Sequence, residues 1–302
     1  MADLKSLRKR IGSVKNTQKI TRAMKMVAAA RLNRAQQRIT SMRPYAVRVR
    51  SVLSEVVAAA DAMMEGGEHG GEVDHPLLAR RPEKSTLILV MSGDRGLSGP
   101  FNSSVNKAAE KAWKERVDAG QTVHLAVIGR KGRDYFKRRG APVDSYLEKV
   151  WDDLGPERAR SIAQEITKPF RAGKVDAIYI VYNEFKSAMT QKVNVEPLFP
   201  LSRAIEGTPE ASDARAATFS FEPSKDALLD RLVPMYIEIT ILRALYESRA
   251  SFFGAQMTAM DSATKNASEL IEKLTLKYNR ARQAAITTEI MEIIGGAEAL
   301  NG

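Results

Sequence analysis

The sequence contains no cysteine and has three histidines among its 302 residues. The absence of cysteine excludes disulfide bonds, thiolate metal sites and thiol nucleophiles. No apolar run approaches the roughly 20 residues that a membrane-spanning helix requires, and the opening stretch MADLKSLRKRIGSVK lacks the apolar centre of a secretory signal. Hydrophobic residues nevertheless make up 44% of the chain, which predicts a folded protein.

The three histidines offer few candidates for catalysis or metal binding. His69 and His75 lie among acidic residues in EGGEHGGEVDH, which could be drawn as a metal site, but glycine-broken acidic loops are more often simply solvated. Ser98, Ser103 and Ser104 have no histidine near them in the sequence, and no two carboxylates are spaced as an acid and base pair. We therefore predict neither a resident metal nor a catalytic residue.

Positive charge is concentrated at the start of the chain. Residues 1–50 contain fourteen lysines and arginines against a single acid, Asp3, while the whole chain has a net charge of +11. The rest of the chain is thus close to neutral. An electrostatic partner is expected to meet mainly this first segment.

Two long segments, one at each end, carry apolar residues at alternating spacings of four and three, the heptad pattern of paired helices. The first stripe is read as Leu4, Leu7, Ile11, Val14, Ile20, Met24, Val27, Ala35, Ile39, Met42, Ala46, Val49, Leu53, Val56, Ala60 and Met63. The second is read as Leu228, Leu232, Met235, Ile239, Leu242, Tyr246, Phe253, Met260, Ala263, Ala267, Leu270, Leu274, Ala281 and Ala284. We expect Pro44 to bend the first helix and Ser224 to cap the second.

The middle of the chain changes to strand-like runs. These lie at 86–92, 122–129 and 175–183, separated by amphipathic segments at 101–118 and 156–171, with weaker strand candidates at 143–150 and 191–199. Alternation of strands and helices at short spacing predicts a small, mostly parallel α/β sheet of Rossmann-like type.

These patterns together predict a mixed, α+β fold in which the small α/β domain is inserted between two long helices. Because both helices leave the same domain, we expect them to pair as a long antiparallel coiled coil. The expected boundaries are a helix over 1–63, a loop over 64–84, the α/β domain over 85–202, a linker over 203–222 and a second helix over 223–302.

The stretch MSGDRGLSGPFN, residues 91–102, follows a predicted strand and contains three glycines. Its spacing matches neither a P-loop nor a dinucleotide-binding turn, and Asp94 would place a carboxylate where a phosphate has to lie. Pro100 suits the first turn of a helix. We interpret the stretch as a structural turn from strand to helix, with a nucleotide-using enzyme as an alternative.

The basic first helix has several interpretations. No aromatic residue precedes Tyr45 in this segment, but a nucleic-acid backbone could be followed by five of its cations: Lys15, Lys19, Arg22, Lys25 and Arg34. The helix could also lie on an anionic membrane, or present a solvated charged face. Charge of one sign repels itself along a helix, so acidic protein partners are a further possibility.

Three motifs then point to a family. The stretches KNTQKITRAMKMVAAARLNRAQ (15–36), SGDRGLSGPFN (92–102) and LTLKYNRARQAAITTEIMEIIGGAEAL (274–300) resemble the gamma subunit of the rotary F-type ATP synthase. The motifs span the chain in the family's order. The resemblance implies a non-catalytic central shaft, one copy per complex, that couples rotation of a membrane c-ring to the catalytic sites and regulates ATPase activity and proton flow.

The resemblance also implies partners: a hexamer of alpha and beta subunits, an epsilon subunit or its delta-type equivalent, and the c-ring, with no nucleic acid. ATP, ADP and magnesium would be bound by the alpha and beta subunits, and no cofactor by this chain. Residues expected to contact the hexamer are Arg22, Met24, Lys25, Asp94, Arg95, Arg282, Gln283, Thr287 and Glu289.

Two features qualify the match. At Gln256 many relatives carry arginine, which puts a polar contact there in question, and the absence of cysteine argues against the light-regulated plastid form. We expect a peripheral protein on the cytoplasmic face of a bacterial inner membrane, with the matrix side of the mitochondrial inner membrane as the alternative.

Overall fold

The computed structural model describes residues 2–65, 81–201 and 225–301. By packing, the chain divides into two units, which we call the helical unit (Met1–Ala29 with Gln256–Gly302) and the sheet unit (Ala30–Ala255). His69, His75, Ser224 and the predicted linker 203–222 lie outside the described residues.

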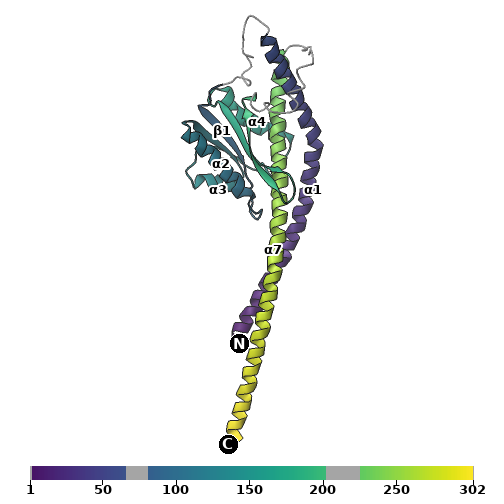
Figure 1. Ribbon diagram of the computed structural model, residues 1–302, viewed down its shortest axis with the longest axis vertical. Coiled ribbons are helices and arrows are strands. Elements are labelled where there is room, and N and C mark those ends of the chain that lie inside the picture. The colour runs from purple at the N-terminus through teal and green to yellow at the C-terminus, as the bar shows by residue number, and fades with distance from the viewer. Residues whose placement is uncertain (1, 66–80, 202–224, 302) are drawn as a thin grey trace. The chain divides into compact units, whose positions relative to one another are not determined.

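Both predicted long helices are present. Helix α1 runs from Ala2 to Glu65 and continues through Pro44, and helix α7 runs from Lys225 to Asn301 (Figure 1). Each helix contributes to both units. None of the described helices is both long and apolar enough to cross a membrane.

Within the helical unit the two helices are antiparallel, as predicted. Gln18 contacts Ser268, Thr21 contacts Thr264 and Lys25 contacts Asp261, so residue numbers rise along α1 while they fall along α7. Buried Leu7, Ala28 and Leu274 belong to the same contact stripe.

Four members of the predicted stripes are misplaced, and one of them, Ala284, is exposed near the end of α7. Ile20 is 60% exposed, Val27 51% and Leu270 38%. The stripe of α1 instead keeps a spacing of seven from Leu7, which places Thr21 and Ala28 inside, at 8% and 0% exposure. Because heptad geometry decides which positions face the partner, a threonine takes a place that its apolar neighbour was expected to fill.

The sheet unit contains a five-stranded sheet in the order β3-β2-β1-β4-β5. The strands are β1 (Ser85–Met91), β2 (Thr122–Ile128), β3 (Val143–Leu147), β4 (Ala177–Phe185) and β5 (Gln191–Phe199). All neighbouring pairs are parallel except β4 and β5, which are antiparallel. The predicted mostly parallel sheet is confirmed, including both weaker strand candidates.

Alternate residues of the central strands enter two cores. Leu87, Leu89 and Met91 of β1 face helix α4 (Pro156–Arg171) and parts of α1 and α7. Ile88 and Val90 face helices α2 (Phe101–Asp118) and α3 (Arg130–Lys137). The sheet is therefore covered on both faces (Figure 1), which agrees with the nearly continuous apolar sequence of β1.

Helix α3 was not anticipated from the sequence. Its eight residues, RKGRDYFK, contain a glycine and mostly charged side chains, so the segment is too short and too polar to stand out as a helix. Buried Phe136 attaches the helix to the core. Gly132 lets it approach β1 closely, because a Cβ there would lie 2.5 Å from the Ser92 hydroxyl oxygen.

Candidate functional site

The glycine-rich stretch 91–102 is a tightly bonded turn that joins β1 to α2. The Gly93 N–H donates to the Asn102 side-chain oxygen at 2.8 Å, and the Asn102 amide donates to the Arg95 carbonyl at 3.0 Å. The Ser92 carbonyl accepts from the Trp151 indole at 2.8 Å. These hydrogen bonds show that the stretch is a structural turn, as its sequence predicted.

Asp94 lies at the start of α3. Its Oδ1 accepts a hydrogen bond of 2.9 Å from the Arg130 backbone N–H, the first residue of that helix. A carboxylate is favoured at this position by the unpaired N–H groups and the helix dipole. The place that an anionic ligand could otherwise take is thus filled by the protein's own side chain.

The Asn102 side chain both accepts and donates a hydrogen bond within this turn, so two substitutions can remove one or both of these bonds. Asn102→Ala is expected to lower the free energy of unfolding by about 2 kcal/mol, because the buried Gly93 N–H and the Arg95 carbonyl both lose their partner. Asn102→Asp keeps the acceptor for Gly93 and should lose less. Urea unfolding followed by tryptophan fluorescence measures both, and equal losses would contradict the assignment of the Gly93 bond.

Beside this turn lies a groove that we call the arginine groove. It consists of two cavities of about 290 and 360 Å³ that share Arg31, Trp151, Asp152, Arg249 and Phe253. Asp94 and Arg95 line the first cavity, whereas Arg34 and Arg38 line the second. The groove thus combines α1, α7, the β1–α2 turn and the segment after β3.

The arginines of the groove stack on aromatic rings. Arg31 lies 5.8 Å from the Phe253 ring centroid, Arg38 lies 5.9 Å from that of Tyr246, and Arg249 lies 4.9 Å from that of Phe253. Such contacts hold a guanidinium in place without neutralising it. Burial lowers the pKa of Arg249, and the neighbouring charge of Arg31 lowers it further.

The groove carries an excess of positive charge. Five arginines line it against three aspartates, Asp94, Asp152 and Asp153. Among the residues that the structure describes, Arg31, Arg34, Arg38 and Arg249 form no ion pair with a carboxylate. The Ser248 hydroxyl, which also lines the groove, is fully buried and has no hydrogen-bond partner within the described chain. The arrangement suits an acidic partner.

A second feature lies in the helical unit, where three polar pairs interrupt the apolar stripe. The Gln18 amide donates to the Ser268 hydroxyl at 2.7 Å, and the Thr21 and Thr264 hydroxyls are 2.8 Å apart. Lys25 Nζ lies 2.5 Å from Asp261 Oδ1. Its hydrogen bond lowers the pKa of the Asp261 carboxyl, and Lys265 adds to this effect.

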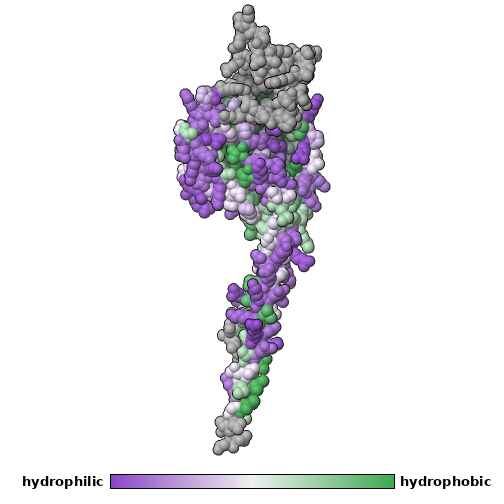
Figure 2. Space-filling model, in the orientation of Figure 1, coloured by the Kyte–Doolittle hydropathy of each residue, from purple (hydrophilic) through white to green (hydrophobic). Residues whose placement is uncertain are grey.

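The C-terminal part of α7 is uncovered. From Arg282 to Ala297 every side chain except Ala285 is exposed. The large apolar residues among them are Ile286, Ile290, Met291, Ile293 and Ile294. Figure 2 shows hydrophobic side chains gathered toward this end of the helix. Exposed aliphatic residues in such number are typical of a surface that a partner covers.

The nine residues predicted to meet partners fall into three places. Asp94 and Arg95 lie in the arginine groove, while Arg282, Gln283, Thr287 and Glu289 are exposed on the end of α7. Arg22, Met24 and Lys25 lie on α1 in the helical unit: Arg22 is exposed, Met24 is half-buried and Lys25 is paired with Asp261.

Other residues of the groove were missed. Arg31, Arg34 and Arg38 repeat at spacings of three and four, which already places them on one helix face. Trp151 and Arg249 gave no such signal, because the fold brings them together from segments about a hundred residues apart.

Sequence comparisons identify relatives over the whole chain. A family model described as ATP synthase matches residues 3–300. The ATP synthase gamma chain of Sorangium cellulosum is 56% identical, with 99% of each chain covered. That of Anaeromyxobacter sp. is 47% identical and covers 99% of this chain and 100% of the relative.

Solved structures share the fold. A chain from the mitochondrial ATP synthase of Euglena gracilis aligns with a TM-score of 0.67 at 16% identity, covering 99% of this chain and 95% of its own length. One from the central stalk and c-ring structure of the Tetrahymena thermophila mitochondrial ATP synthase gives 0.60 at 23% identity, covering 81% and 99%. With the full-length sequence matches, this leads to one conclusion: the chain belongs to the gamma-chain family of ATP synthase.

Proposed function

We propose that this chain is the non-catalytic rotor of the complex. It couples rotation of a membrane c-ring to the conformational cycle of catalytic sites on the beta subunits, and thereby regulates ATPase activity and proton flow. It acts as a peripheral subunit on the cytoplasmic face of a bacterial inner membrane. The alpha and beta hexamer, an epsilon-type subunit and the c-ring are its partners, with one gamma chain per complex.

The observation that carries this proposal is the unpaired positive charge of the arginine groove. Four arginines there have no carboxylate partner among the described residues, and aromatic rings hold three of them in place. An acidic loop of a beta subunit would supply the missing charge. Because the contact is electrostatic, it can form with each of three successive subunits without a closely fitted interface.

The exposed end of α7 supports the same role in a different way. Its aliphatic residues, among them Ile290 and Ile293, form no core in the helical unit. An apolar helix end can turn inside a surrounding ring of subunits, since aliphatic contacts have no directional preference. Arg282, Gln283, Thr287 and Glu289 provide polar contacts on the same stretch.

Nucleotide and magnesium are bound by the alpha and beta subunits in this proposal. The glycine-rich turn supports this division, since Asp94 already occupies the N-terminus of α3 and presents negative charge there. The turn then shapes the edge of the arginine groove.

Removing charge from the groove tests the proposal. A triple variant, Arg31→Gln with Arg34→Gln and Arg38→Gln, is assembled into the ATP synthase of membrane vesicles. We expect proton pumping per ATP hydrolysed to fall about tenfold, the effect of about 1.4 kcal/mol. The readout is fluorescence quenching of a pH-sensitive dye at matched hydrolysis rates.

The control removes the same charge elsewhere. Lys107, Lys111 and Lys137 are exposed on α2 and α3, and their replacement by glutamine should leave pumping unchanged. Pumping that is equal in the two triple variants would contradict the role of the groove. Recovery of the wild-type chain with nucleic acid rather than in an ATPase complex would instead favour the alternative in which the basic first helix binds nucleic acid.

A further inference from the structure

Glu247 of α7 is a buried carboxyl group without an adequate partner. Its residue is 9% exposed, and its Oε2 has no hydrogen-bond partner within the described chain. Its Oε1 lies 3.8 Å from Arg243 Nη1, which is too far for a hydrogen bond. Burying an ionised carboxylate in this way is costly, so the neutral acid is favoured.

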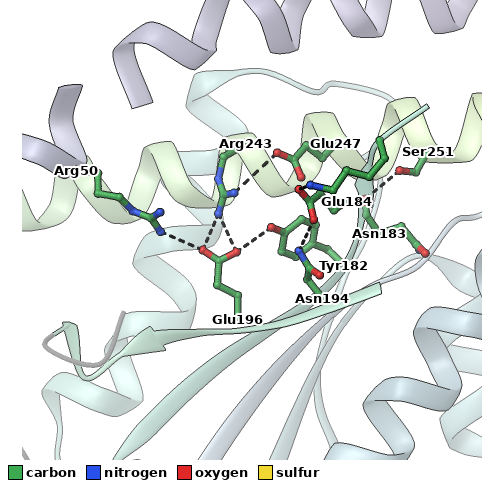
Figure 3. Close-up of polar contacts among 10 residues, drawn as sticks. Arg50, Tyr182, Asn183, Glu184, Asn194, Glu196, Arg243, Glu247 and Ser251 are labelled. Carbon is green, nitrogen blue, oxygen red and sulfur yellow. Dashed lines mark hydrogen bonds and ion pairs between the residues drawn. The ribbon is translucent and has the colours of Figure 1, made fainter. Parts of the chain in front are cut away.

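The donor that Glu247 needs is engaged by another carboxylate. Arg243 Nη2 donates to both oxygens of Glu196 at 2.6 and 2.8 Å, and this contact attaches α7 to β5 (Figure 3). The Tyr182 hydroxyl donates to Glu196 at 2.8 Å, and Arg50 of α1 lies 3.5 Å from it. Glu196 thus has three donors, whereas the described residues provide no hydrogen-bond donor to Glu247.

The groups around Glu247 come from every packed element. Arg243 lies on its own helix, Tyr182 and Glu184 come from β4, and Glu196 comes from β5. The remaining charged groups are Lys186, in the turn between β4 and β5, and Arg43 and Arg50 of α1. Glu184 is itself bonded to Lys186 and to Asn194.

The carboxylates of Glu184 and Glu196 disfavour a negative charge on Glu247. Burial raises the pKa of Glu247 to about 7, with Arg243 opposing the rise and Glu184 and Glu196 adding to it. A cavity of about 170 Å³, lined by Glu247, Glu184 and Arg243 among others, adjoins the group. It offers room for water to accept the proton.

We propose that Glu247 is a proton-controlled latch between α7 and the sheet. The neutral acid leaves Arg243 on Glu196, and the α7–β5 contact is tight. When Glu247 loses its proton to water in the cavity, its carboxylate competes for the guanidinium of Arg243, and the α7–β5 contact loosens. The latch concerns the response of the sheet unit to pH and goes beyond the proposed rotor function.

Hydrogen exchange of the full chain tests the latch. Protection of the β5 amides bonded to β4 is measured at pH 6 and pH 8, with rates corrected for intrinsic exchange. The wild-type chain is expected to lose up to about tenfold in protection, because a group titrating near pH 7 becomes mostly ionised by pH 8. Glu247→Gln should show no such loss.

Glu238→Gln is the matched control, since Glu238 also lies on α7 but pairs with exposed Arg160. It should behave as the wild type. Equal wild-type protection at the two pH values, or the same loss in Glu247→Gln, would overturn the proposal.

A second measurement needs no variant. In the full chain labelled with carboxyl-¹³C glutamate, one signal is expected to titrate near pH 7. A spectrum in which no glutamate titrates above pH 6 would overturn the latch even if Glu247→Gln fails to fold.

Discussion

Replacing Gly129 by alanine is expected to lower the free energy of unfolding of the sheet unit by about 4 kcal/mol. Gly129 follows β2 with a φ of +90°, and a Cβ there would lie 2.2 Å from the Ser92 carbonyl oxygen and 2.6 Å from its carbonyl carbon. Both are backbone atoms, which cannot rotate away. Strain at positive φ and overpacking add to the expected loss.

The backbone around Gly129 has little freedom to yield. The Ser92 N–H donates to the Ile128 carbonyl at 2.9 Å, and the Ser92 hydroxyl donates to the same carbonyl at 2.8 Å. Moving Ser92 away from a new methyl group would break these bonds and the bond from Trp151. The substitution should therefore also distort the adjoining edge of the arginine groove.

Gly140 provides the control, because it has a φ of +64° but a Cβ added to it would meet no atom within 4 Å. Gly140→Ala is expected to cost about 1 kcal/mol, the backbone contribution alone. Urea unfolding followed by tryptophan fluorescence separates the two, since Trp151 is bonded to Ser92. Equal losses in the two variants would show that the close approach at Gly129 is not the cause.

The second large effect is the pH dependence of stability conferred by Glu247. Its pKa is about 7 in the folded chain, against an ordinary value of 4.5 for a glutamate. Between these values the folded state holds a proton that the unfolded state has lost, so stability falls as pH rises through this window. The interval corresponds to about 3 kcal/mol, and the contribution should be constant above about pH 8.

The substitution Glu247→Gln should remove this decrease in stability with rising pH. The variant and the wild type are expected to be similarly stable near pH 4.5, and the variant should be more stable by up to about 3 kcal/mol at pH 8. Urea unfolding of the full chain at a series of pH values gives the difference in the free energy of unfolding between the variant and the wild type. The contributions of the other titrating groups cancel in this difference. A difference that does not change with pH would mean that Glu247 titrates normally.

The elements of the fold were largely predictable because they repeat. Helices α1 and α7 are marked by heptads, and β1, β2 and β4 by apolar runs that two covered faces require. Prediction failed where one position departs from its pattern. Ile20 looked suited to the stripe, yet the spacing of seven places Thr21 there, and its partner Thr264 lies 243 residues away.

The candidate site was predictable only in part, for a related reason. Asp94 and Arg95 belong to a recognisable motif, and the basic character of α1 is a property of local sequence. The contacts that make a groove or a latch are pairs such as Trp151 with Ser92 and Arg243 with Glu196. No local pattern marks these partners, because the sheet and α7 bring them together only after folding.

The polar pairs of the helical unit determine how the two helices can be aligned. A stripe of aliphatic residues alone would tolerate displacement by one heptad, since each repeat offers similar contacts. Such a displacement here would put Lys25 opposite Ser268 instead of Asp261, and Thr21 opposite Ile271 instead of Thr264. The repeats are therefore unequal, and the paired helices are protected against lengthwise slippage when one is pulled or twisted against the other.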